Sequence, residues 1–297
     1  MPSKPLLIQV TGLQRSGNHA IIGWLESLFT RPLHLNDVEH DYLADPRRIA
    51  EIRAAADRDC VIVSFEDSGD RIARGTPLLD HVHYARPEDF PGIRVERRYI
   101  LRDPYNCWAS RAKAQAGQGL TSSPRVEHFI ADWKALARLW PRDPDAFLCY
   151  NHWFRDAAYR QAACSRLEGR YSEATLDEVS SVGGGSSFDG YVRPTYRDIL
   201  GNLRGKYLGP EFLGRFARKP GRYIQRLVSP RPKGSKLSVE ERWRYLLGRD
   251  DAAPLFDDTE LAHLSETIFG FSVTADGTVR TGNPATEPRA AHAAAGH

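Results

Sequence analysis

The most distinctive stretch of the sequence is a polar loop that lies between two glycines, Gly12 and Gly17, and contains Arg15. An apolar run precedes the loop at residues 6–10, and apolar residues recur at helical spacing from Ala20 onward. A strand, a glycine-bracketed loop and a helix in this order bring backbone N–H groups together at a helix N-terminus, which is a binding site for anions such as phosphate. The alternative is an ordinary glycine-containing turn that binds nothing.

This loop differs from the phosphate loop of nucleoside triphosphatases, in which Lys and then Ser or Thr follow the second glycine. Here Asn18 and His19 follow Gly17, so the loop lacks both the lysine that bridges phosphates and the hydroxyl that holds Mg²⁺. The cation lies within the loop instead, at Arg15. We therefore expect a phosphate site without a metal rather than a site for a metal-bound triphosphate.

Two carboxylates, Glu66 and Asp67, directly follow a second apolar run at residues 60–65. Ligands of open parallel sheets bind at the carboxyl ends of the strands, so these residues either take part in chemistry or cap the turn that follows. His81 and His83 alternate in the next, loop-rich segment. They could line a site or bind a metal, and a surface position is the simpler interpretation.

A third strand is expected at residues 95–101, and Arg102 follows it directly. A helix is expected at residues 105–115, and it carries Ser110. An arginine at a strand end and a serine in the following helix project toward the same crevice, where they can bind an anion. The alternative is a surface arginine beside an ordinary helical serine.

The rest of the chain alternates apolar runs with amphipathic segments, which is typical of an α/β protein. Further extended segments are expected near residues 32–37 and 147–150. Further helices are expected at residues 46–57, 125–140, 154–167, 176–182, 239–247 and 258–269. We expect one domain over residues 1–275 and a disordered tail over residues 276–297. The basic segment 203–236 is either a solvated stretch or a flap over an anionic ligand.

Composition limits the function classes. The 297 residues carry a formal net charge of +3, and this mild charge argues against a general nucleic-acid binder. No run approaches the roughly 20 apolar residues of a membrane span, and the apolar run at the N-terminus is too short for a signal peptide. The four widely spaced cysteines indicate buried thiols rather than disulfides or a zinc site. We expect a cytoplasmic protein.

Three segments, taken in order, resemble the sulfotransferases that use 3′-phosphoadenosine 5′-phosphosulfate (PAPS) as sulfuryl donor. The family's first signature is a loop of the type Lys-Ser-Gly-Thr-Thr-Trp, whose counterpart here is Arg15-Ser16-Gly17-Asn18-His19-Ala20. The second is a strand end with Arg, then Asn/Asp-Pro and a later Ser, matched by Arg102-Asp103-Pro104 and Ser110. A weaker third match, a tyrosine at a strand end and a later Ser-Phe, is formed by Tyr150 and Ser187-Phe188.

The resemblance implies a three-layer α/β sandwich with a central, mostly parallel sheet and a P-loop-like strand–loop–helix. It also implies an enzyme that moves a sulfuryl group from PAPS, its co-substrate, to an acceptor hydroxyl. The interleaved tryptophans and tyrosines suit a glycan or a glycolipid as acceptor, and a phenol, another small molecule and a peptide tyrosine are the alternatives. The alternatives are a P-loop kinase for small molecules and a non-catalytic nucleotide-binding protein with the same fold.

The resemblance also implies roles for nucleotide-binding residues. The loop at residues 15–20 would grip the 5′-phosphosulfate, Arg102 and Ser110 would bind the 3′-phosphate, and Phe188 would stack on adenine. The family's basic strip near the C-terminus also holds the 3′-phosphate. Its counterpart does not align, and the candidates are Arg218, Lys219, Arg231 and Lys233.

The chemical roles follow in the same way. The base that takes the acceptor's proton would be Glu66, with His83 and His81 as alternatives. Arg15 replaces the family's lysine, so we expect it to stabilise the leaving phosphate by charge and hydrogen bonds without donating a proton. His19 is then an alternative proton donor, and contact with the anion is its simpler role.

Overall fold

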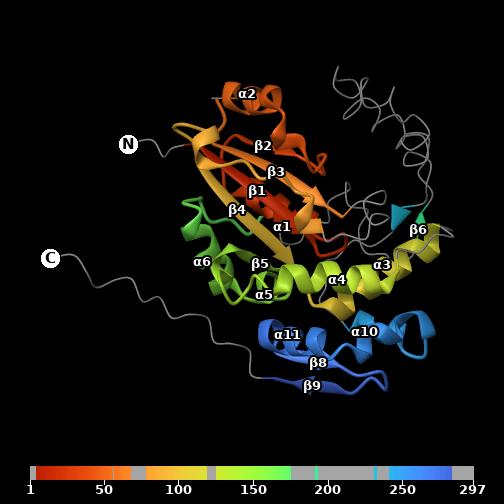
Figure 1. Cartoon of the computed structure of the whole chain (residues 1–297). Coiled ribbons are helices and arrows are strands. Elements are labelled where there is room, and N and C mark those ends of the chain that lie inside the picture. The colour runs from red at the N-terminus through yellow and green to blue at the C-terminus, as the bar shows by residue number, and fades with distance from the viewer. Residues whose placement is uncertain are drawn as a thin grey trace.

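The computed structural model of the chain describes residues 5–55, 57–67, 78–118, 125–174, 191–192, 231–232 and 241–282. At its centre is a five-stranded parallel sheet, flanked by helices, with the strand order β2-β3-β1-β4-β5 (Figure 1). The strands of this sheet are β1 (Leu6–Gly12), β2 (Pro32–Leu35), β3 (Cys60–Glu66), β4 (Arg94–Leu101) and β5 (Phe147–Cys149). Two short antiparallel pairs are formed by β6 (Tyr191–Val192) with β7 (Arg231–Pro232) and by β8 (Phe271–Val273) with β9 (Val279–Thr281).

The described helices connect and cover these strands. They are α1 (Asn18–Ser27), α2 (Pro46–Ala54), α3 (Pro104–Gln118), α4 (Val126–Ala137), α5 (Tyr150–Arg155), α6 (Ala157–Arg166), α10 (Ala253–Asp257) and α11 (Thr259–Phe269). Two 3₁₀ segments also matter below, η3 (Leu78–Asp80) and η7 (Arg242–Leu246). None of the described helices is long and apolar enough to cross a membrane.

Strand β1 lies at the middle of the sheet, and every one of its residues is buried. A strand that is covered on both faces favours an apolar run, and residues 6–10 are apolar except for Gln9. The register with both neighbours is parallel, and it places Gly12 beside Glu66 of β3 and Ile100 of β4. The polar residues that follow these three strands therefore lie at one carboxyl edge of the sheet.

Helices and loops cover the sheet on both faces. Gln9 and Thr11 share a face of β1 because side chains alternate along a strand. The Gln9 side chain exchanges two hydrogen bonds with the backbone of Ala85, and the Thr11 hydroxyl lies 2.7 Å from that of Tyr84. The segment with Tyr84 and Ala85 therefore covers the face of β1 that carries Gln9 and Thr11. Helix α1 packs against β2 and β3. Its Trp24 meets Trp153 of α5 edge to face, at a ring separation of 6.2 Å.

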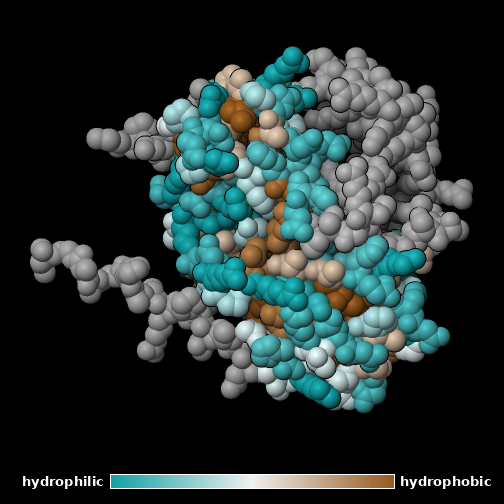
Figure 2. Space-filling model, viewed as in Figure 1, coloured by the Kyte–Doolittle hydropathy of each residue, from teal (hydrophilic) through white to brown (hydrophobic). Residues whose placement is uncertain are grey.

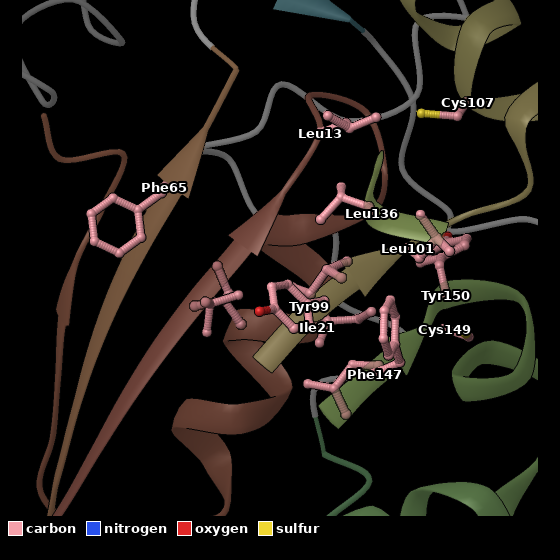
Figure 3. Packing of buried hydrophobic residues seen from close by; sticks show 14 of the residues in the cluster. Leu13, Ile21, Phe65, Tyr99, Leu101, Cys107, Leu136, Phe147, Cys149 and Tyr150 are labelled. Carbon is pink, nitrogen blue, oxygen red and sulfur yellow. The ribbon is translucent and has the colours of Figure 1, made fainter. Parts of the chain in front are cut away.

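The C-terminal elements continue the fold beyond α4 (Figure 1). Trp133 of α4 packs against Phe269 of α11, and the Lys134 ammonium pairs with the Asp258 carboxylate at 2.7 Å. Figure 3 shows part of the apolar interior, with Leu13 at the end of β1 and Tyr150 beside Leu101. The face in Figure 2 is mostly hydrophilic, with a narrow band of apolar residues. Of the large hydrophobic side chains in the described residues, only that of Val279 is exposed.

Several predicted boundaries need correction. Tyr150 is the first residue of α5 rather than the end of a strand. The helix predicted at residues 154–167 is two helices, because Asp156 ends α5 and caps α6 by accepting a hydrogen bond from the Ala158 N–H. The segment predicted as a helix at residues 239–247 contains the 3₁₀ segment η7 instead.

The tail predicted from residue 276 begins too early, because the strand β9 pairs with β8 up to Thr281. The parallel α/β sheet that we predicted is confirmed. The helix predicted at residues 176–182, most of the basic segment 203–236 and the rest of the tail lie outside the described residues.

Candidate functional site

The loop between β1 and α1 depends on its two glycines. Gly17 has φ = 90°, in the left-handed region that favours glycine, and it is the N-cap of α1. A Cβ at Gly17 would overlap the Tyr150 ring, and one at Gly12 would overlap the Asn18 side chain. Arg15 also has a left-handed backbone, with φ = 70°. The loop therefore folds back tightly between β1, α1 and α5.

The loop presents backbone donors at the start of α1. The first N–H groups of a helix have no acceptor within the helix, and those of Gly17 and Asn18 make no hydrogen bond within the described part of the chain. Arg15 is half-buried beside them, whereas Ser16 is fully buried. The Ser16 hydroxyl lies 3.5 Å from the Cys107 thiol, whose pKa burial raises to about 11. Cys107 is therefore a protonated packing partner of the loop.

A second cationic cluster lies next to the loop. Arg102 is 4 % exposed, and its guanidinium lies 3.5 Å from the hydroxyl of Ser110 and 3.4 Å from the carbonyl oxygen of Arg15. The guanidinium of Arg242, from η7, lies 3.4 Å from the same Ser110 hydroxyl. Two guanidinium groups and one hydroxyl thus converge beside the phosphate-type loop, and all three are donors of the kind that bind phosphate oxygens.

Tyr150 connects the loop with this cluster. Its ring packs against Gly17, and the Arg102 guanidinium lies 4.9 Å from the ring centroid. Trp153 and Phe154 of α5 support the ring, at centroid separations of 5.8 and 6.1 Å. The tyrosine therefore fixes where Arg102 lies relative to the start of α1.

A buried network holds the second cluster in place. The Asp103 carboxylate accepts hydrogen bonds from the side-chain amides of Asn106 and Asn151. The Asn106 side chain accepts the N–H of Trp243 at 3.2 Å, which fixes η7 against α3. Trp243 is buried, so it anchors the neighbouring Arg242 next to Ser110.

Glu66 lies beside the loop at the end of β3. Its carboxylate accepts a hydrogen bond from the side-chain amide of Asn18 at 2.8 Å, and the same amide donates to the Leu13 carbonyl at 3.0 Å. The imidazole Nε2 of His40 lies 3.2 Å from the Glu66 carbonyl oxygen, which can only accept, so His40 donates there. Glu66 is half-buried. Its carboxylate is oriented by the hydrogen bond from Asn18, the residue that follows Gly17 at the end of the loop.

Histidines gather around the ends of β2 and β3. His34 lies 3.0 Å from the Ser64 hydroxyl, and burial together with the nearby His19 lowers the pKa of His34 to about 4. The ring of His81 stacks on that of His40 at a separation of 6.2 Å. His83 has an exposed side chain and meets His40 through its backbone N–H.

The structure brings most of the predicted site residues together. The loop with Arg15, Ser16 and Ala20 lies near Arg102 and Ser110, and Glu66 and Tyr150 contact the loop directly. His19 lies toward His34, on the β2 side of the loop. His81 stacks on the ring of His40, and His83 donates its backbone N–H to the carbonyl oxygen of His40. The predicted residues Ser187, Phe188, Arg218, Lys219 and Lys233 and the side chain of Arg231 lie outside the described residues.

Two features of the site were not predicted. Arg242 was missed because its segment was interpreted only as an amphipathic helix. A sequence signal did exist, since Arg242 and Arg244 flank Trp243, and a tryptophan that anchors in the core fixes its neighbours against it. The role of Asn18 in orienting the Glu66 carboxylate was also missed. The sequence predicts a helix start near residue 18, but it does not indicate which side chain of that helix start faces β3.

The fold and site define a parallel α/β protein with a strand–loop–helix at one carboxyl edge of its sheet. Arg15 lies in that loop, and the cluster of Arg102, Arg242 and Ser110 lies beside it. Within the described residues, no group of three or more His, Cys, Asp or Glu residues is arranged to hold a metal ion. Comparison of the chain with known protein families and with curated proteins finds no match in either case.

Proposed function

We propose that the protein is a sulfotransferase that transfers the sulfuryl group of PAPS to an acceptor hydroxyl. The observation that carries the proposal is the convergence of Arg102 and Arg242 on the Ser110 hydroxyl beside the glycine-bracketed loop. A nucleotide with phosphate groups at both its 3′ and 5′ positions needs two separate cationic sites, and the loop with Arg15 and the cluster of Arg102, Arg242 and Ser110 are the two candidates.

The 5′ end of the donor fits the loop. The N–H groups of Gly17 and Asn18, the positive end of the α1 dipole and Arg15 would surround the phosphate that departs when the sulfuryl group is transferred. Arginine stays protonated, so Arg15 stabilises the growing charge on that oxygen without giving up a proton.

The 3′-phosphate fits the second cluster. Its oxygens would accept from Arg102, Arg242 and Ser110, three donors that come from a strand end, η7 and α3. Charge-assisted contacts of this kind fix orientation as well as contributing affinity. Tyr150 lies between the two pockets, where its ring can border the nucleoside.

The reaction requires one bond to form and one to break. The acceptor oxygen attacks sulfur, the bond between sulfur and the bridging phosphate oxygen breaks, and the electron pair stays on the departing phosphate. The acceptor's proton passes to the Glu66 carboxylate, which the Asn18 amide holds beside the loop. Attacking and leaving oxygens lie in line in such transfers, so positioning and electrostatics carry most of the rate acceleration.

The kinase alternative has less support from the site. Asn18 and His19 stand where a kinase loop has Lys and Ser or Thr, and the Asn18 amide is engaged with Glu66 and Leu13. No feature of the described site replaces the phosphate-bridging lysine at that position.

The proposal is tested by measuring transfer of ³⁵S from labelled PAPS to a panel of saccharides, glycolipids, phenols and small alcohols. We expect acceptor-dependent release of 3′-phosphoadenosine 5′-phosphate. The variant Glu66→Gln should lower kcat at least about 100-fold, the scale of a general base. It should leave the dissociation constant of the desulfated nucleotide within about twofold, because the amide keeps a hydrogen-bond acceptor for Asn18.

Glu88→Gln is the matched control, since Glu88 is exposed and pairs only with Arg86 among its described ion pairs. It should leave both quantities unchanged. Phosphate transfer from ATP and Mg²⁺, without affinity for the bisphosphate nucleotide, would establish the kinase alternative. Tight binding of the bisphosphate without transfer to any acceptor would establish a non-catalytic binding protein.

A further inference from the structure

One buried carboxylate touches both halves of the proposed nucleotide site. Asp67 directly follows β3, and it is 2 % exposed. Its Oδ1 atom accepts the backbone N–H of Gln14 at 2.5 Å, and its Oδ2 atom accepts a hydrogen bond from the Arg111 guanidinium. Gln14 belongs to the loop between β1 and α1, whereas Arg111 belongs to α3.

The two partners of Asp67 are sequence neighbours of the two phosphate-binding groups. Gln14 precedes Arg15, whose carbonyl oxygen meets Arg102 at 3.4 Å. Arg111 follows Ser110, whose hydroxyl lies between Arg102 and Arg242. The Asp67 carboxylate thus joins the loop of one pocket to the helix of the other through two hydrogen bonds.

The Asp67–Arg111 pair is shielded from water. The side chains of both residues are 3 % exposed, and the Arg111 guanidinium lies 5.6 Å from the ring centroid of Phe129. A buried ion pair that also binds a backbone N–H holds its partners in one geometry, because any displacement leaves an unpaired charge inside the protein. The distance between the two pockets is therefore fixed before a ligand binds.

We propose that Asp67 is a positioning residue that couples the two phosphate pockets, so that both ends of a bisphosphate nucleotide bind together. The inference rests on the proposed function. A nucleotide with two phosphates behaves as a bivalent ligand, and its affinity exceeds that of either half when the two sites are held at the matching separation. Without the link through Asp67, each pocket can still form, but their separation is no longer fixed.

The test uses the double variant Asp67→Asn with Arg111→Met. Asp67→Asn alone leaves Arg111 as a buried charge without its partner, and this single variant risks failing to fold. The double variant removes both charges, and the asparagine oxygen still accepts the Gln14 N–H. The matched control is Lys134→Met with Asp258→Asn, which removes a partly buried ion pair between α4 and the N-cap of α11.

Dissociation constants are measured by calorimetry for 5′-AMP, 3′-AMP and 3′-phosphoadenosine 5′-phosphate. We expect the double variant to bind each monophosphate within about twofold of the unmodified protein and to bind the bisphosphate at least about tenfold more weakly, within the usual range of coupling between sites. The control should bind all three ligands unchanged.

Three results would overturn the inference. An equal loss for all three ligands would mean that the pair supports the fold alone, and an unchanged bisphosphate affinity would mean that it couples nothing. In both cases the proposed function stands. If the unmodified protein binds the bisphosphate no more tightly than it binds either monophosphate, the proposed function is overturned together with the inference.

Discussion

Replacing Gly17 with alanine tests the geometry on which the loop depends. The added methyl group would lie about 2.6 Å from Cε2 and 2.9 Å from Cγ of Tyr150, closer than real Cβ atoms approach. The left-handed backbone of Gly17 costs an alanine about 1–2 kcal/mol, and displacing a buried ring costs about 1–3 kcal/mol more. We therefore expect Gly17→Ala to lower the free energy of unfolding by about 2–5 kcal/mol.

Gly23→Ala is the matched control, because Gly23 lies in the same helix and its Cβ would meet nothing within 4 Å. Alanine favours the helix over glycine, so this variant should be about 0.5–1 kcal/mol more stable than the unmodified protein. Urea unfolding followed by circular dichroism measures both values. The reasoning is refuted if Gly17→Ala is as stable as the unmodified protein, since the methyl group would then have found room beside Tyr150.

The half-buried His34 and the buried Asp132 predict opposite effects of pH on stability. The pKa of His34 falls from 6.5 to about 4 on folding, because burial and then His19 disfavour its cation, so stability is lost as pH falls through this range. The loss reaches about 2 kcal/mol at pH 5 relative to pH 8, and His34→Gln, which keeps an acceptor for Ser64, should remove it. Burial raises the pKa of Asp132 from 3.8 to about 6, with the nearby Asp67 charge adding to the rise, so stability is lost as pH increases through that range. Asp132→Asn, which keeps the acceptor for the Leu78 N–H, should therefore be more stable than the unmodified protein at pH 8, by up to about 3 kcal/mol. Urea midpoints between pH 4.5 and 8 check both variants, and pH profiles parallel to that of the unmodified protein would show that neither group titrates as described.

The fold could be predicted because its signals are local. The apolar runs that became β1 and β3 are bounded by polar or glycine residues, and α1 and α2 lie between these two parallel strands. Helix boundaries that depend on a single side chain were harder to predict. Asp156 divides a predicted helix into two because its carboxylate caps the second, and an N-cap within an apolar pattern is easily overlooked.

The positions of candidate site residues could be predicted where these residues lie at strand ends, as Glu66 and Arg102 do, because parallel strands share their carboxyl edge. Arg242 was not predictable in this way, since it reaches Ser110 through the packing of Trp243 against α3, where the Trp243 N–H donates to the Asn106 side chain. The link from Asp67 to Arg111 likewise joins residues far apart in the sequence. Contacts of this kind arise from tertiary packing. The sequence can indicate that Trp243 anchors its neighbours, but it does not indicate which residues they meet.

The measurement that tests the central claim most directly compares the affinities of 3′-phosphoadenosine 5′-phosphate and 5′-AMP for the unmodified protein and for Arg242→Gln. Hydrogen bonds between charged groups contribute about 1.5–3 kcal/mol each, so the 3′-phosphate should strengthen binding at least about tenfold. Arg242→Gln should remove most of that gain and leave 5′-AMP binding unchanged. Equal affinity for the two nucleotides in the unmodified protein would contradict the account, because the cluster of Arg102, Ser110 and Arg242 would then hold no phosphate.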